Sequence, residues 1–335
     1  MDATAGSAIK LEIEVDAGDV LIFDWNFQSN DGGFFNDFSF VSISPDNSSG
    51  FLFELADANS EPPSYQTFEY KFTTGGTYEI GMGVIDAWDT IVDSQLFIDN
   101  LRVVHEILGT SGNDQLNGTG DDERIKGFAG NDQINGNGGH DILLGGSGND
   151  TIAGGSQSDY IDGGADDDTL FGNGGSDTIF GRSGNDGLYG SSAADYLDGG
   201  SGHDTLFGNG GEDTLIGGGG ADLIYGGSDA DEILSGGGND TIYANGANSG
   251  SDYINTGSGF DTVWLGHGAA TVVLETGAGF DEIKNFQLGQ TTFLVSGCNW
   301  SVQNSADGAV IYQGGDKLAV VSWQQASTVA SHIIC

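Results

Sequence analysis

Carboxylates recur at every ninth residue through the middle of the chain. Aspartate occupies thirteen consecutive positions of this register, from Asp132 to Asp240, and an acid also fills the two positions before them. Carboxylate oxygens are hard ligands, which suit calcium better than softer metals. We therefore expect these acids to bind calcium: Asp114, Glu123, Asp132, Asp141, Asp150, Asp159, Asp168, Asp177, Asp186, Asp195, Asp204, Asp213, Asp222, Asp231 and Asp240.

A branched aliphatic residue follows two positions after each acid, as in Asp150 and Ile152, and glycine begins almost every unit. One of the most regular copies is "GGSGNDTIA" at 145–153. Glycine permits positive φ and close backbone approach in tight turns. The aliphatic residue lies in a short strand that cannot bury its apolar face alone. Successive units must therefore stack on one another.

The register slips after Asp240. The next acids are Asp252, Asp261 and Asp281, and Ala270 stands where another acid is due. We interpret this stretch as decayed repeats that close the stack, and we include its three aspartates among the expected calcium ligands.

This segment resembles the calcium-binding repeats of RTX (hemolysin-type) proteins, whose nonapeptide is G-G-x-G-x-D-x-U-x. The resemblance implies a parallel β-roll in which two nonapeptides form one coil and calcium lies between stacked coils. Acids two units apart, such as Asp132 and Asp150, would then act in pairs. About 13 such pairs would offset roughly +26 of the formal charge of −42. The implied cofactor is thus multiple Ca²⁺.

The repeat is uneven in its fourth glycine, which is lost in the units of Asp159, Asp168, Asp195 and Asp231. Three of these acids, Asp159, Asp195 and Asp231, recur at every fourth unit and so fall on one side of the roll. We expect this side to bind calcium more weakly than the other.

Aromatic residues recur in every second unit at its last position: Phe171, Tyr189, Phe207, Tyr225 and Tyr243. They are expected to stack on one outer face. Such a row is either a docking surface for another domain, copy or ligand, or ordinary cross-strand stacking in a sheet.

Composition limits the partners. The 335 residues carry 8 basic and 50 acidic side chains, which excludes nucleic acid as a natural partner. The sequence contains no run of 18 apolar residues, so it predicts no membrane span. The beginning of the chain lacks the basic and apolar regions of a Sec signal peptide. Cys298 and Cys335 are too few for a disulfide framework, and spacing alone leaves their pairing open.

Residues 1–106 differ from the repeat. Alternating apolar segments such as "DVLIFDWNF" and "GTYEIGMGVID", separated by Gly, Asp and Asn turns, predict an antiparallel β-sandwich. The segment resembles the jelly-roll modules that precede RTX repeats in bacterial surface proteins. Asp24, Asn36, Asp37 and Asp99 could hold one calcium or contact a ligand, although Asp and Asn are also common turn formers.

We therefore expect an all-β chain of three parts. They are a β-sandwich at 1–106, a calcium-binding β-roll at 107–285 and a β cap at 286–335. The cap is the place where RTX proteins carry an uncleaved type I secretion signal. Solenoid ends also need caps.

The sequence predicts a secreted calcium-binding protein and no enzyme. It contains no H-E-x-x-H or G-x-S-x-G motif. We expect an extracellular or cell-surface bacterial protein, exported by a route other than Sec, whose roll folds on calcium and serves as a structural or adhesive module. Two alternatives stay open: an adhesin that binds glycan or peptide through its sandwich, and a calcium-dependent self-assembling surface-layer or fibre protein.

Overall fold

The computed structural model describes residues 8–28, 38–45, 51–57, 66–85, 95–245, 250–275, 279–287, 289–296, 299–314 and 316–334. The chain divides into two compact units, Met1–Glu106 and Ile107–Cys335. Both are built of strands, and within the described residues helix is confined to α1 (Ala326–Ala330). The predicted all-β fold with a parallel β-roll is confirmed.

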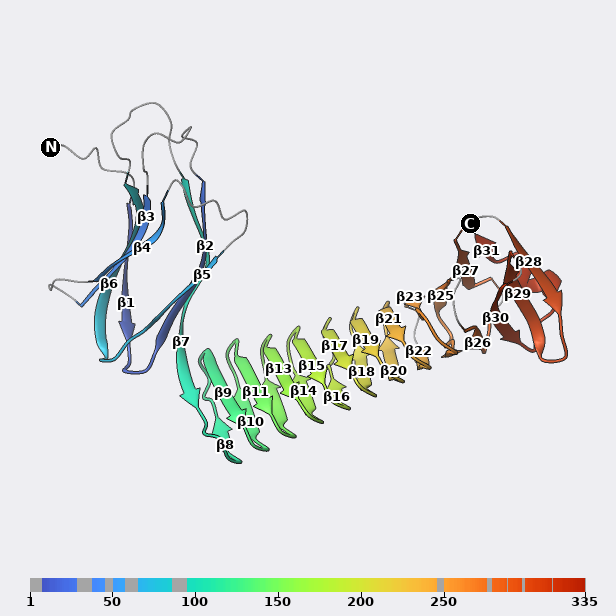
Figure 1. The fold of residues 1–335 in the computed structure, drawn as a ribbon, viewed down its shortest axis with the longest axis horizontal. Coiled ribbons are helices and arrows are strands. Elements are labelled where there is room, and N and C mark those ends of the chain that lie inside the picture. The colour runs from blue at the N-terminus through green and yellow to red at the C-terminus, as the bar shows by residue number, and fades with distance from the viewer. Residues whose placement is uncertain are drawn as a thin grey trace, which may run out of the picture. The chain divides into compact units, whose positions relative to one another are not determined.

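The first unit contains two antiparallel sheets (Figure 1). One has the order β1-β6-β3-β4 and the other joins β7, β2 and β5. The strands are β1 (Ala8–Val15), β2 (Val20–Gln28), β3 (Phe38–Pro45), β4 (Phe51–Asp57), β5 (Gln66–Lys71), β6 (Gly76–Ile85) and β7 (Gln95–Leu108). Apolar side chains from both sheets share one core, including Phe23 and Trp25 of β2, Ile43 of β3 and Ile80 of β6. The alternating pattern thus forms a sandwich. Its jelly-roll topology stays a prediction.

The second unit is a β-roll whose strands alternate between two parallel sheets (Figure 1). One sheet contains β8 (Gln115–Asn117), β10 (Gln133–Asn137), β12 (Thr151–Gly155), β14 (Thr169–Asn173), β16 (Gly187–Tyr189), β18 (Thr205–Gly210), β20 (Leu223–Ser228), β22 (Thr241–Asn245), β24 (Thr262–Trp264) and β26 (Asp281–Lys284). The other contains β9 (Glu123–Ala129), β11 (Ile142–Ser147), β13 (Tyr160–Ala165), β15 (Thr178–Ser183), β17 (Tyr196–Ser201), β19 (Thr214–Gly219), β21 (Glu232–Gly237), β23 (Ser251–Asn255), β25 (Ala269–Leu274) and β27 (Thr291–Val295).

Neighbouring strands in each sheet come from units two apart in the chain. Leu188 of β16 lies beside Leu206 of β18, and Leu197 of β17 lies beside Leu215 of β19. The aliphatic residue of each unit points inward, and those from Ile125 to Ile242 are fully buried. The core is therefore a continuous column of Leu and Ile, which supplies the apolar burial that a three-residue strand lacks alone.

The slip in the register is a three-residue insertion. Thr241 pairs with Thr262 and Ile233 with Ile254, so both pairs span the insertion. Asp252 and Asp261 consequently take the same structural positions as earlier acids of the repeat. The insertion accommodates three extra residues between β22 and β23 while both sheets continue.

The C-terminal segment closes the roll. Strands β28 (Trp300–Asn304), β29 (Gly308–Gln313) and β30 (Asp316–Ser322) form an antiparallel meander, and β30 pairs with β26 in parallel. Strand β31 (Ile333–Ile334) pairs with β27 in the other sheet. The meander covers the end of the apolar column, because Ile311, Leu318 and Val321 belong to the same buried core as the repeat.

No helix in the described part of the chain is long and apolar enough to cross a membrane.

Candidate calcium-binding turns

Most acids of the repeat lie in the turn that leads into a strand, and their side chains are buried from Glu123 onwards. Asp204 and Asp213 are both about 1% exposed. Asp114, at the beginning of the series, is half-buried. Burying an ionised carboxylate is costly unless it is hydrogen-bonded or neutralised. The partners of its two oxygens therefore decide what each turn can do.

The first oxygen, Oδ1, is bonded in the same way along the roll. It accepts a hydrogen bond from the backbone N–H of the acid one coil earlier, as from Asp195 to Asp213 at 2.8 Å. The contact recurs with N–O distances of 2.7–3.2 Å from the pair Asp114–Asp132 to the pair Asp240–Asp261. Acids 18 residues apart are thus brought together, and across the insertion the spacing becomes 21.

The second oxygen, Oδ2, is buried without a hydrogen-bond partner in thirteen of the described aspartates. These are Asp132, Asp141, Asp150, Asp159, Asp168, Asp177, Asp186, Asp204, Asp213, Asp222, Asp231, Asp240 and Asp261. A buried unsatisfied polar atom costs about 1–3 kcal/mol, and more when it is charged. Such a series in one structure indicates positions where a cation belongs.

Most of these unbonded oxygens lie beside a glycine that leaves space. A Cβ built on Gly208 would lie 2.4 Å from Asp213 Oδ2 and 2.6 Å from the carbonyl oxygen of Gly226 in the next coil. Gly127 shows the same arrangement, with Asp132 Oδ2 at 2.2 Å and the carbonyl oxygen of Gly145 at 2.6 Å. The first glycine of the unit is therefore required sterically, to keep a cradle of carboxylate and carbonyl oxygens open.

A second feature is left-handed backbone four residues before the acid. Asn137, Asn173 and Asn209 have φ of 73–76° there, and glycine occupies the position in most other turns. Phe128 and Arg182 adopt φ of 77° and 78°, which is uncommon for such bulky residues. This conformation in the turn therefore does not require glycine.

The electrostatic cost appears in the pKa values. Burial, with neighbouring carboxylates as a smaller cause, raises the pKa of Asp168 and Asp213 to about 8. The pKa of Asp159 and Asp231 rises to about 7 for the same main reason. Ionising these four acids in the metal-free folded roll is therefore unfavourable at neutral pH, and a bound cation would relieve the cost.

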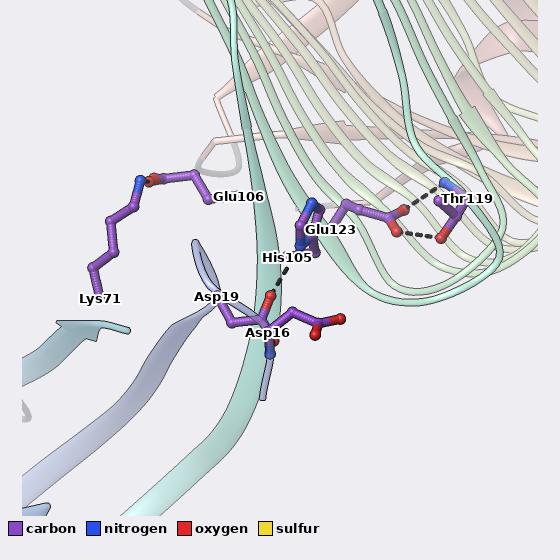
Figure 2. A network of polar contacts seen from close by, with 7 residues as sticks. All are labelled: Asp16, Asp19, Lys71, His105, Glu106, Thr119 and Glu123. Carbon is purple, nitrogen blue, oxygen red and sulfur yellow. Dashed lines mark hydrogen bonds and ion pairs between the residues drawn. The ribbon is translucent and has the colours of Figure 1, made fainter. Parts of the chain in front are cut away.

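Four acids differ, because the chain itself supplies donors to their second oxygen. Thr110 donates to Asp114, and Thr119 donates from its backbone N–H to Glu123 Oε2 at 3.0 Å (Figure 2). Ser191 donates to Asp195, and Thr256 donates through its hydroxyl to Asp281. The ninefold spacing and its decayed continuation place these acids among the expected calcium ligands and do not distinguish them from the others. The sequence does carry a signal for three of these four acids: a Ser or Thr stands four residues before each of Asp114, Glu123 and Asp195.

The expected N-terminal site is only partly described. Asp24 accepts a hydrogen bond from Thr67 Oγ1 at 2.7 Å, and the strand register places it opposite Asp99. Asn36 and Asp37 lie outside the described residues, as do Cys298 and Cys335. Among the described residues, no three His, Cys, Asp or Glu side chains gather as a metal cluster. Metal binding in the described turns would thus need backbone oxygens as well as carboxylates.

An aromatic ladder runs along the outer face of the sheet that contains β14 to β24. It consists of Phe171, Tyr189, Phe207, Tyr225, Tyr243 and Trp264, with adjacent ring centroids 4.7–6.1 Å apart. Interplanar angles of 4–18° show face-to-face stacking. The predicted stack is confirmed and gains Trp264, which the insertion had hidden.

The donor set of the turns fits calcium. The cradles offer carboxylate and carbonyl oxygens, which are the ligands that calcium takes in proteins. Comparison with protein families also indicates calcium binding. The profile of the RTX calcium-binding nonapeptide repeat matches residues 108–143, 136–170, 144–179, 171–206, 207–242 and 246–283. Comparison with curated proteins gives no match.

Proposed function

The chain belongs to the RTX calcium-binding nonapeptide repeat family, and from this premise we propose that its β-roll folds on calcium outside the cell and acts as a structural or adhesive module. One observation carries the proposal: thirteen buried Oδ2 atoms without hydrogen-bond partners, many of them beside a carbonyl oxygen of the next coil. A bound calcium supplies the positive charge that these atoms lack. The aspartates that bear them, with Asp252, are the proposed ligands.

The same geometry supports folding that depends on calcium. The fold packs acids with strongly raised pKa one above another, so their mutual repulsion opposes closure at neutral pH. A ligand that binds only the folded state adds its binding free energy to the stability of that state. The aliphatic column and the paired aspartates would then order together as the ion binds.

Location follows from this chemistry. RTX repeats are typical of secreted bacterial proteins. We propose export by a type I route, with its signal in residues 286–335, and folding in the calcium-rich exterior. In the cytosol, where calcium is scarce, carboxylate repulsion would keep the repeat open and ready for export.

Hydrogen exchange of the full chain, followed by mass spectrometry with calcium and with chelator, tests the proposal. We expect peptides from residues 130–245 to lose protection in chelator, because the stacked coils open. Peptides from the β-sandwich, with its separate apolar core, serve as an internal control and should keep their protection. Equal protection of the repeat in both buffers would refute calcium-dependent folding.

The aromatic ladder favours a second candidate function, which is self-association of the roll. The outward side chains beside it are Thr151, Thr169, Thr205, Leu223, Thr241 and Thr262, so the strip is uncharged up to its end, where Lys284 Nζ lies 5.0 Å from the centre of the Trp264 ring. The opposite sheet carries Asp162, Asp198 and Glu232. Two copies of a strongly acidic chain meet with least repulsion across such a neutral strip. Because the rings stack on one another, they offer edges to a partner instead of faces.

Sedimentation velocity at rising calcium tests this second function. Self-association through the strip predicts a dimer or larger species that the substitution Phe207→Asp abolishes. The substitution Phe180→Asp, on the opposite sheet, should leave association unchanged. A chain that stays monomeric with calcium bound would exclude the self-assembly alternative, and a glycan array would then test the β-sandwich.

A further inference from the structure

The turn at residues 190–195 is closed by its own backbone. Ser191 N–H donates to Asp195 Oδ2 at 2.7 Å, while Asp177 N–H donates to Asp195 Oδ1 at 2.7 Å. Both oxygens of this carboxylate thus have backbone donors. In the following turn of the same column, Asp213 Oδ1 is bonded to the Asp195 amide but Oδ2 has no partner.

The conformation of the residue four positions before the acid separates the two kinds of turn. It is left-handed in each of the twelve turns from Asp132 to Asp240 that leave Oδ2 unbonded, as at Asn209 with φ 76° and Gly218 with φ 101°. The left-handed residues do not include Thr110, Thr119 or Ser191. In those three turns the backbone N–H of the hydroxyl residue instead faces the carboxylate.

The hydroxyl group strengthens the closed form. Thr110 Oγ1 donates to Asp114 Oδ2 at 3.0 Å, and the Thr119 hydroxyl donates to Glu123. Ser191 Oγ accepts from the N–H of Ala193 at 3.4 Å. Ser and Thr form such local turns readily, whereas they tolerate left-handed backbone poorly. The residue type therefore decides whether the second carboxylate oxygen in the cradle is bonded (a closed turn) or left without a partner (an open turn).

Losing the fourth glycine has no such effect. Asp166 and Asp229 replace that glycine and keep left-handed φ of 77° and 80°, and the acids of their turns, Asp168 and Asp231, retain unbonded Oδ2 atoms. Asp159 also retains one, although Gln157 fills its fourth-glycine position. The second position of the unit, and not the fourth, distinguishes the closed turns.

We propose that the turns of Asp114, Glu123 and Asp195 bind no calcium, because backbone donors already occupy the carboxylate oxygen that would face the ion. This inference rests on the proposed function, since it concerns the same turns. It makes the first coil independent of calcium. The acids of alternate units stack in two rows, one on each side of the roll. The closed turn of Asp195 then interrupts the row of calcium sites from Asp141 to Asp252, while the row from Asp132 to Asp240 stays continuous.

A gain of binding gives the sharpest test. The double substitution Ser191→Gly and Ala193→Gly restores both turn glycines before Asp195 and permits left-handed backbone there. Native mass spectrometry of the full chain should count one calcium more in this variant than in the wild type. The control Ser192→Gly changes the residue between them and should leave the count unchanged. An unchanged count in the folded double variant would overturn the proposal.

A loss experiment supports the gain experiment. Asp213→Asn should lower the count by one, whereas Asp195→Asn should leave it unchanged. A folded Asp195→Asn variant with one calcium fewer would also overturn the proposal. If Asp195→Asn does not fold, the double glycine variant decides. A wild type that binds no calcium would instead reject the proposed function, so the two failures are distinguishable.

Discussion

Adding a single methyl group to Gly208 should close one cradle. The new Cβ would lie 2.4 Å from Asp213 Oδ2 and 2.6 Å from the Gly226 carbonyl oxygen, where ordinary contact begins at 3.4 Å. The carboxylate would have to retreat by 3.4 − 2.4, or about 1 Å, and the carbonyl by 3.4 − 2.6, or about 0.8 Å. Gly226 belongs to β20 in the middle of a sheet, so its backbone cannot move freely.

The expected cost has two parts. Overpacking of this kind costs about 1–3 kcal/mol. Loss of one bound calcium removes a further ~2.7 kcal/mol when the ion is present at 100 times its dissociation constant. Gly208→Ala should therefore destabilise the surrounding coils by about 4–6 kcal/mol in calcium.

Hydrogen exchange of peptides from β18 to β20 measures this local opening free energy. Gly219→Ala is the matched control, because a Cβ there meets nothing within 4 Å. That variant should stay within ~0.5 kcal/mol of the wild type. If Gly208→Ala keeps both its calcium count and its local protection, the cradle is not the calcium-binding site.

Three other predictions concern the roll. The raised pKa values mean that the metal-free folded state binds protons more tightly than the unfolded chain, so its stability should be greatest near pH 4 and fall as pH rises towards 8; circular dichroism in chelator should gain β signal on acidification, and a pH-independent signal would contradict this. Leu206→Ala, in the fully buried column, should cost about 2–5 kcal/mol in urea unfolding with calcium, against a much smaller loss for Leu234→Ala on the half-buried outer face. Tyr225→Ala removes two stacked contacts, at 4.7 and 4.8 Å, and should cost about 1–3 kcal/mol; a loss no larger than that of Tyr253→Ala, at an exposed tyrosine of the opposite sheet, would show that the stacking contributes little.

Much of the roll could be predicted because its repeat is strict. A spacing of nine with an aliphatic residue after each acid defines the coil, the inward column and the stacked partners two units away. The aromatic ladder was predicted from the same spacing, because its residues recur in every second unit. Trp264 was missed because the three-residue insertion between β22 and β23 moves it out of the count. Periodicity alone could not show that both sheets continue across that insertion.

The closed turns could not be predicted from the repeat consensus. The units of Asp168, Asp195 and Asp231 all lack the fourth glycine of the consensus, so at that position they look alike. The closed turn of Asp195 differs in the backbone conformation of its second residue, and Phe128 and Arg182 show that non-glycine residues can hold left-handed φ at that position. Hydrogen bonding to the acid, and not glycine content, separates the turns. The weaker calcium side expected from glycine loss stays a prediction.

The amide-to-carboxylate contacts give the roll a direction. Each carboxylate accepts a hydrogen bond from the backbone N–H of the coil before it. A coil later in the chain therefore stabilises the coil that precedes it. At the beginning of the series Asp114 has no earlier acid of the repeat to supply an amide, and Thr110 donates to it instead. The two ends of the roll therefore differ: removing a coil from the C-terminal end exposes amides, whereas removing one from the N-terminal end exposes carboxylates. Export that delivers the C-terminal end first would present each coil with its carboxylates before the amides that they bond.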